Sequence, residues 1–288
     1  MLGRLVGMNV NFAERAHNHN WKLDPIVRSL LDTDFYKLLM LQFIWKNFPQ
    51  IHVTSEVTNR TVKMRLAERV GAAALIEQME HVRQLKFRRS ELVWLAGNTF
   101  YGTRSIFSPD FLEWLEDGFK LSEYEVSEHD GQLVLRFHGK WTDVTMWEVY
   151  ALAIVSELKT RTALAELSEL ELDVLYARAK TRLWDKIKLL SAPGLEGLRI
   201  SDFGTRRRHS FLWQEYCVQA MRLSLNQNGA GYRETARFTG TSNTALAYKH
   251  DLEAIGTNAH ELPMAMAALA SRGTDEELRA SQYKVLEL

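Results

Sequence analysis

The 288-residue sequence has a single cysteine, only five prolines and no excess of either charge. One cysteine excludes a disulfide within the chain, which is typical of a protein from a reducing cytosol. Cys217 lies inside an apolar helical pattern and has no evident basic partner nearby in the sequence. We therefore interpret it as a buried, unreactive thiol rather than as a nucleophile.

Lys and Arg together number 36, as do Asp and Glu, so the formal net charge is zero. A bulk nucleic-acid-binding protein would have a basic excess, so we expect no nucleic-acid partner and only a local basic site. No apolar run reaches the roughly 18 residues that a membrane span needs, and the N-terminal region lacks a secretory hydrophobic segment. These absences favour a cytoplasmic protein without a membrane partner. Residues 1–27 read as a flexible leader, in which His17 and His19 belong to a disordered arm rather than a metal site.

The patterns over residues 28–160 predict an α+β N-terminal domain with helices that also pack on the following domain. An apolar helix begins after cap candidates at 32–34 and ends before Pro49. Alternation over 51–57 predicts a strand, and an Asp-Gly pair at 130–131 between two alternating runs predicts a hairpin. Further helices are expected at 66–97, after Ser108, at 145–162 and at 163–190.

From about residue 195 the pattern changes to strand, turn and helix, repeated three times. The strands are expected in "LRISDFG", "ARFTGTSN" and "LEAIGTNAHE". Helices follow from Thr205 to about Leu225, at 243–250 and after 260. This repetition is typical of a parallel α/β fold.

Each of the three predicted strands is followed by a Gly-Thr turn: Gly204–Thr205, Gly240–Thr241 and Gly256–Thr257. Ligands of parallel α/β folds bind beyond the carboxyl ends of the strands, where the N–H groups of helix N-termini attract anions. Arg206 would add a permanent charge with a fork suited to phosphate or carboxylate. Since neighbours on a helix point about 100° apart, at least one of Arg207 and Arg208 should face solvent or an acidic partner.

Three further residues are candidates at this edge of the sheet. His260 opens a helix, where a neutral imidazole could act as a nucleophile or base; the alternative is a histidine hydrogen-bonded within the edge. Phe203 ends a strand and Tyr36 lies in the first helix, so a flat aromatic ligand could stack between the two rings. Taken alone, Tyr36 fits a core or interface position better than a ligand contact.

Four segments, "SLLDTDFYKLLM", "SDFGTRRRHS", "FTGTSNTALA" and "IGTNAHE", resemble in order and spacing those of the nicotinate phosphoribosyltransferase family. "SEVTNRT" and "WEVYALAIVSEL" between them add to the resemblance. The family joins nicotinate to phosphoribosyl pyrophosphate, which gives nicotinate mononucleotide for NAD salvage with coupled hydrolysis of ATP. The resemblance implies an α+β N-terminal domain followed, over residues 161–288, by the first part of an irregular α/β barrel of the type II phosphoribosyltransferase kind. It also implies a homodimer, and Mg²⁺ as a cofactor beside ATP.

The resemblance also implies roles for individual residues. His260 would be the transient phosphohistidine, and Thr257 would contact nicotinate. Tyr36 would reach across from a neighbouring subunit and stack on the pyridine ring, opposite Phe203. The phosphoribosyl and carboxylate groups would be lined by Arg206, Thr241 and Ser242.

The family's chains are longer and continue through further βα units, whereas this sequence ends in a helical pattern without a Gly or Pro stop signal. We therefore expect an incomplete barrel, with the main Mg²⁺ ligands in the absent part. An alternative function follows: a truncated, inactive remnant that acts at most as a phosphate-binding or interaction module. A third hypothesis is a purely structural α/β protein whose arginines are only solvated.

Overall fold

The computed structural model describes residues 25–59, 61, 63–195, 197–225, 236–257, 260–271 and 273–287. The predicted leader, including His17 and His19, lies outside these residues except for 25–27. Ile26 and Val27 are fully buried, so the packed part of the chain includes residue 26. Within the described residues, no helix is long and apolar enough to cross a membrane.

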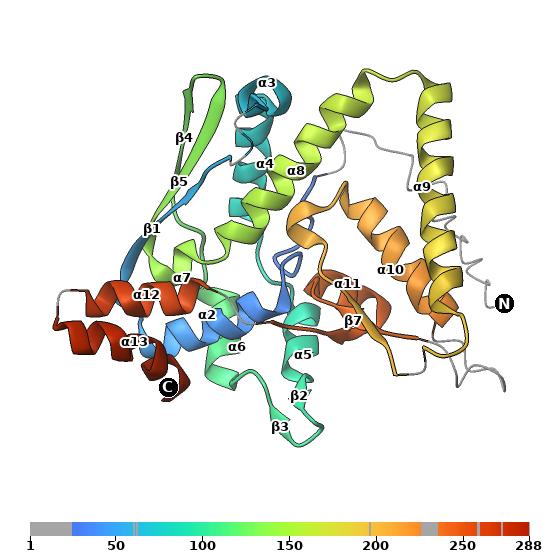
Figure 1. Cartoon of the computed structure of the whole chain (residues 1–288). Helices are drawn as coiled ribbons and strands as arrows, with labels where there is room; N and C mark the ends of the chain where they lie inside the picture. Colours follow the sequence, from blue (N-terminus) through green and yellow to red (C-terminus); the bar gives the residue numbers. More distant parts are fainter. Residues whose placement is uncertain are drawn as a thin grey trace, which may run out of the picture.

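An antiparallel sheet forms one side of the molecule (Figure 1). Its strands β1 (His52–Val57), β5 (Gln132–Lys140) and β4 (Tyr124–His129) lie in the order β1-β5-β4. The predicted strand and hairpin are both confirmed. Asp130 and Gly131 have φ angles of 50° and 73°, which match a tight type I′ turn.

The helices beside this sheet differ from prediction in one respect. The single helix expected over 66–97 is three helices, α3 (Leu66–Val70), α4 (Ala72–Gln84) and α5 (Arg89–Ala96). Gly71, at φ 72°, ends α3, and Leu85 adopts an extended conformation that ends α4. The predicted apolar stripe is nevertheless buried at Leu75, Met79 and Val82.

The remaining elements of this half include two helices predicted from their caps and composition. Ser108 accepts a hydrogen bond from Phe111 N and begins α6 (Pro109–Asp117). The apolar helix α2 (Phe35–Asn47) follows Asp34. The short elements are β2 (Thr99–Phe100), β3 (Arg104–Ser105) and α7 (Trp141–Val144).

Helix α8 (Trp147–Ala165) runs between the antiparallel sheet and the C-terminal half (Figure 1). It is apolar around most of its circumference, as the sequence predicts, and residues on several of its faces are buried. Helix α9 (Glu169–Leu190) follows, and it begins at a capping box formed by Ser168 and Glu171. It is much more exposed, with only Tyr176 and Ile187 buried.

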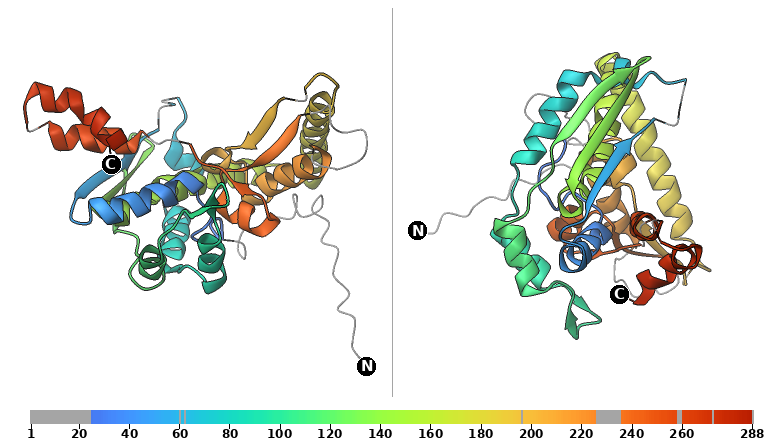
Figure 2. Two further views of the ribbon diagram at one scale, coloured as in Figure 1. Left: turned by 90° about the horizontal axis from the view of Figure 1, so that it is seen from below. Right: turned by 90° about the vertical axis from the view of Figure 1, so that its left-hand side faces the viewer.

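The C-terminal half contains the predicted parallel strands. They are β6 (Arg199–Asp202), β7 (Arg237–Thr241) and β8 (Glu253–Ala254), in the order β6-β7-β8. The helices are α10 (Phe211–Leu225), α11 (Thr244–His250), α12 (Glu261–Ala270) and α13 (Asp275–Glu287). The described residues form no closed barrel, because β6 and β8 are the two edges of the sheet. Helices α12 and α13 project from one end of the molecule (Figure 2).

The helix expected from Thr205 begins instead at Phe211. Residues Thr205–Arg207 form one 3₁₀ turn, and Arg208 is extended. Two acceptors then start α10: Ser210 Oγ accepts from Trp213 N at 3.0 Å, and the carboxylate of Glu157 accepts from Phe211 N at 2.9 Å. A carboxylate at a helix N-terminus satisfies a free N–H group and the dipole together.

Candidate functional site

The three Gly-Thr turns lie at one edge of the parallel sheet, as predicted. Asp202 pairs in register with Thr241, and Thr241 pairs with Ala254. The carboxyl ends of β6, β7 and β8 are therefore aligned. We call the turns 203–206, 241–243 and 255–257 the site edge.

The start of α2 crosses the middle of the site edge. Phe35 N donates to Ser242 O at 2.7 Å, and Thr244 N donates to Thr33 O at 2.8 Å. The N-terminus of α11 is also capped by its own chain, since Leu246 N donates to Asn243 Oδ1. The expectation that this turn offers free N–H groups to an anion is therefore wrong: residues 33–35 and the Asn243 cap occupy them.

The hydroxyls of Thr241 and Ser242 are fully buried and directed at carboxylates. Thr241 Oγ1 donates to Asp202 Oδ2, and Ser242 Oγ donates to Asp34 Oδ1, both at 2.7 Å. Asp202 also accepts from Gly204 N at 3.1 Å. These bonds connect the first two turns and α2, so the shape of the site edge is set before any ligand arrives.

Arg206 faces the site edge and the start of α2, as predicted. Its side chain is 40% exposed, with Nη1 2.6 Å from Glu148 Oε1 and Nε 3.3 Å from Asp34 Oδ2. Its guanidinium carbon lies 6.0 Å from the centre of the Tyr36 ring, a cation–π distance. The site edge thus places a guanidinium beside an aromatic ring.

Tyr36 belongs to the same chain as Arg206 and is buried. It also contacts the third turn, since a Cβ built on Gly256 would lie 3.4 Å from Tyr36 Cβ. Tyr36 and Arg206 of one chain are therefore neighbours at the site edge. Burial, followed by the charge of Glu148, raises the pKa of the Tyr36 phenol, so it stays protonated at neutral pH.

Opposite charges alternate behind this edge. The ammonium of Lys37 contacts Glu148 at 2.6 Å and Glu261 at 2.5 Å, and Trp141 Nε1 donates to Glu261 Oε1 at 2.6 Å. Burial raises the pKa of Glu148, but Lys37 and Arg206 outweigh it and leave that pKa below its ordinary value. Burial dominates at Asp34 and raises its pKa despite the hydrogen bond from Ser242.

Three predicted residues are accessible to solvent at this edge. The Phe203 ring is 49% exposed, and Thr257 and His260 are exposed as well. His260 immediately precedes α12 and is its N-cap residue.

The two remaining arginines differ from each other. Arg207 is exposed, whereas Arg208 is buried and pairs with Asp32. The prediction that at least one of them meets solvent or an acidic partner is confirmed. Cys217 is half-buried rather than fully buried as predicted, and desolvation raises the pKa of its thiol to about 12, which favours the unreactive thiol of the prediction.

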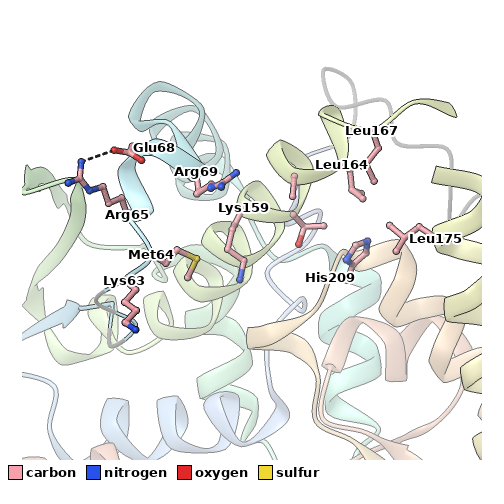
Figure 3. Close-up of a pocket in the computed structure, with 12 residues that line it drawn as sticks. Lys63, Met64, Arg65, Glu68, Arg69, Lys159, Leu164, Leu167, Leu175 and His209 are labelled. Carbon is pink, nitrogen blue, oxygen red and sulfur yellow. Dashed lines mark hydrogen bonds and ion pairs between the residues drawn. The ribbon is translucent and has the colours of Figure 1, made fainter. Parts of the chain in front are cut away.

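A groove of about 760 Å³ lies apart from the site edge, between α3, α8 and α9 (Figure 3). Its lining includes Lys63, Arg69, Lys159 and His209, and none of the predicted site residues. The described residues also contain no group of three or more His, Cys, Asp or Glu side chains that could bind a metal ion.

Asp34, Lys37, Glu148 and Glu261 form the polar framework of the site, and sequence reasoning assigned none of them a site role. The sequence predicts only a helix cap at Asp34. A usable signal existed, because Lys37 and Glu148 interrupt strongly apolar helical patterns, and a charge within such a pattern indicates a buried partner.

Two parts of the chain are similar to known proteins. Residues 31–156 match the nicotinate phosphoribosyltransferase (NAPRTase) N-terminal domain, and residues 198–287 match the NAPRTase family. The crystal structure of nicotinate phosphoribosyltransferase from Vibrio cholerae is similar at 29% identity with a TM-score of 0.72, over 91% of this chain and 56% of that one. The crystal structure of nicotinate phosphoribosyltransferase from Porphyromonas gingivalis is similar at 26% identity with a TM-score of 0.72, over 91% of this chain and 60% of that one. The chain belongs to the nicotinate phosphoribosyltransferase family.

Proposed function

We propose that the site edge binds nicotinate and phosphoribosyl pyrophosphate and takes part in forming nicotinate mononucleotide, with coupled hydrolysis of ATP. The observation that supports this best is the placement of Arg206 beside Tyr36, between turns that follow three parallel strands. Since the chain spans 56% and 60% of the two similar chains, the activity of a whole enzyme is part of the proposal.

Arg206 is the anion-binding group in this proposal. Its fork can make two parallel hydrogen bonds to a carboxylate or phosphate. It now pairs with Glu148 and Asp34, so an incoming anion has to share or replace those contacts. Lys37 provides a second cation that can keep Glu148 neutralised during such an exchange.

The rings and hydroxyls provide shape and orientation. Phe203 is exposed enough to stack on a pyridine ring, and Tyr36 forms a wall beside Arg206. Departure of pyrophosphate places negative charge on the leaving group, which preorganised cations and N–H donors stabilise. Thr257 is exposed on the third turn and can donate to the ligand, whereas Thr241 and Ser242 support the turns from within.

His260 is the proposed phosphate acceptor. One imidazole nitrogen attacks the γ-phosphorus of ATP, the bond from that phosphorus to the bridging oxygen breaks, and ADP leaves. Water later cleaves the P–N bond and releases phosphate. An exposed imidazole at the start of α12 is accessible for both steps, and a phosphoryl group there lies near helix N–H donors.

The guanidinium of Arg206 favours nicotinate over its uncharged amide, because only the acid has a carboxylate with which it can pair. The family resemblance adds a homodimer and a cytoplasmic location to the proposal. Light scattering of the purified chain in solution would test the dimer.

The proposal is tested by incubating the purified chain with nicotinate, phosphoribosyl pyrophosphate, ATP and Mg²⁺, and detecting nicotinate mononucleotide by mass spectrometry. Product that requires phosphoribosyl pyrophosphate and is not formed from nicotinamide supports the proposal. If calorimetry shows phosphoribosyl pyrophosphate binding that is lost in Arg206→Met, but no product forms, the alternative of a phosphate-binding module is favoured.

A further inference from the structure

Lys37 is a fully buried cation that connects two separate parts of the site. Its side chain is 0% exposed, and its ammonium lies between Glu148 of α8 and Glu261 of α12. A buried lysine is stable only when it is paired, and removing its partners leaves an uncompensated charge. The positions of these two carboxylates are therefore coupled to that of Lys37.

Glu261 is fixed at both carboxylate oxygens. Oε2 pairs with Lys37, and Oε1 accepts the hydrogen bond from the buried indole of Trp141. Both partners belong to the packed body of the protein, in α2 and α7. The first turn of α12 is thereby attached through two directional polar contacts.

The rest of α12 packs mainly against α13 and has few contacts with the body of the protein. Met266 is its only buried residue among those described, although Leu262 and Ala265 also pack against the small cluster around Met40 and Trp141. His260 immediately precedes Glu261 and is exposed. The contacts of Glu261 are thus the nearest fixed point to His260 along the chain.

Lys37 is also linked, through Glu148, to the first turn of the site edge. Glu148 contacts Lys37 through Oε2 and Arg206 through Oε1, each at 2.6 Å. A continuous series of opposite charges therefore runs from Arg206 through Glu148 and Lys37 to Glu261. In a partly buried environment such charges hold one another in place more strongly than they would in water.

We propose that Lys37 and Glu261 are positioning residues that fix the start of α12, and so set the place of His260 relative to Arg206. The consequence for phosphorylation of His260 rests on the proposed function. The attachment of α12 does not, and it is measured separately.

The attachment is tested by hydrogen exchange of the whole chain, comparing Lys37→Met and Glu261→Gln with Lys46→Met. Lys46 lies on the same helix but is exposed, so its substitution is a matched control. Glutamine at 261 keeps an acceptor for Trp141 and loses only the charge that pairs with Lys37. We expect the amides of 260–270 to exchange at least about tenfold faster in Lys37→Met than in the Lys46→Met control. In Glu261→Gln they should also exchange faster than in the control, but by a smaller factor.

Two results would overturn the proposal. One is exchange over 260–270 that matches the Lys46→Met control. The other is equal acceleration in the distant β4–β5 hairpin, which would mean that Lys37 supports the whole core rather than α12. If Lys37→Met does not fold, the exchange rates of Glu261→Gln over 260–270, compared with those of Lys46→Met, decide whether the proposal stands.

The link to His260 is tested with labelled ATP in the same variants. Displacement of His260 should lower the maximal rate of acid-labile labelling in Glu261→Gln by about tenfold or more, without changing the ATP concentration for half-maximal rate. An unchanged rate despite faster exchange would refute this link. A wild-type chain without any label would instead refute the phosphohistidine in the proposed function, and the exchange data would still decide the attachment.

Discussion

Arg208 and Asp32 form a two-point ion pair in the interior of the protein. Nη1 lies 2.6 Å from Oδ1 and Nη2 lies 2.8 Å from Oδ2, and each side chain is 1% exposed. Asp32 Oδ1 also accepts from Asn243 Nδ2 at 2.8 Å, and Arg208 donates to Ile26 O. The pair thus joins the segment before α2 to the turns after β6 and β7.

Replacement of Arg208 by Met should destabilise the protein by about 3–5 kcal/mol, because it leaves the Asp32 carboxylate buried without its cation. Urea unfolding followed by circular dichroism measures the change. Arg207→Met is the control, since Arg207 is exposed one position earlier, and its effect should stay within about 0.5 kcal/mol. Similar losses in the two variants would contradict a specific role for the pair.

Gly240 of β7 is needed for close contact with β8. A Cβ built at this position would lie 2.1 Å from the backbone carbonyl oxygen of Glu253, which cannot move without breaking the strand pairing. Gly240→Ala should therefore cost at least about 2 kcal/mol in the free energy of unfolding. Gly197→Ala is the control, because a Cβ there would meet open space. A thermal melt of the Gly240 variant equal to that of the control would show that the contact is absent in solution.

Arg206→Met should weaken binding of phosphoribosyl pyrophosphate by about 10- to 100-fold, the effect expected for losing one or two charge-assisted hydrogen bonds. Titration calorimetry measures the affinity, with Arg207→Met as the neighbouring control. The substitution should change stability much less than Arg208→Met does, since Arg206 is partly exposed. Equal affinities in the two variants would exclude Arg206 as the anion-binding group.

Phe203→Ala should raise the KM for nicotinate by roughly tenfold, the loss of about 1.4 kcal/mol of ring stacking and burial. Because the ring is half-exposed without ligand, the unfolding free energy should change by less than about 1 kcal/mol. Phe203→Leu controls for loss of apolar volume alone. A ring that serves folding only would instead lower stability and leave the KM unaltered.

Acid should weaken the protein partly through Glu215, which is buried between α10 and α11. His250 Nε2 lies 2.9 Å and Lys249 Nζ 2.5 Å from Glu215 Oε1. Burial raises the pKa of Glu215, but these two partners outweigh it and lower that pKa below 4.5. A carboxyl with a lowered folded-state pKa adds stability above its unfolded value, and that stability is lost as the pH falls through the folded value.

The difference in unfolding free energy between wild type and Glu215→Gln should accordingly be on the order of 2 kcal/mol at pH 7 and shrink below about pH 4.5. Urea titrations at a series of pH values provide the measurement. Glu68→Gln is the control, because its pair with Arg65 is exposed and should contribute little at any pH. A difference that stays constant down to pH 3 would contradict the assignment.

Local patterns in the sequence were sufficient for most of the elements. The hairpin follows from Asp130–Gly131 between alternating runs, and α6 follows from Ser108 and Pro109. The predicted helix bounds were wrong where a single residue ended or delayed a helix that the longer apolar pattern would continue. Gly71 divides a helix that the apolar stripe alone would continue, and the extended Arg208 delays α10 because its side chain is drawn to Asp32.

The residues of the site fall into the same two groups: those that local patterns predict and those that only the fold brings together. The sequence by itself determined that three Gly-Thr turns follow parallel strands and that Arg206, Phe203 and His260 are near them, since strand order and turn chemistry are local properties. Only the tertiary structure decided that residues 33–35 cover the turn before α11, and that Lys37 connects Glu148 with Glu261. Those contacts join residues more than a hundred positions apart, and charges pair across such separations according to the packing of helices, which no local pattern encodes.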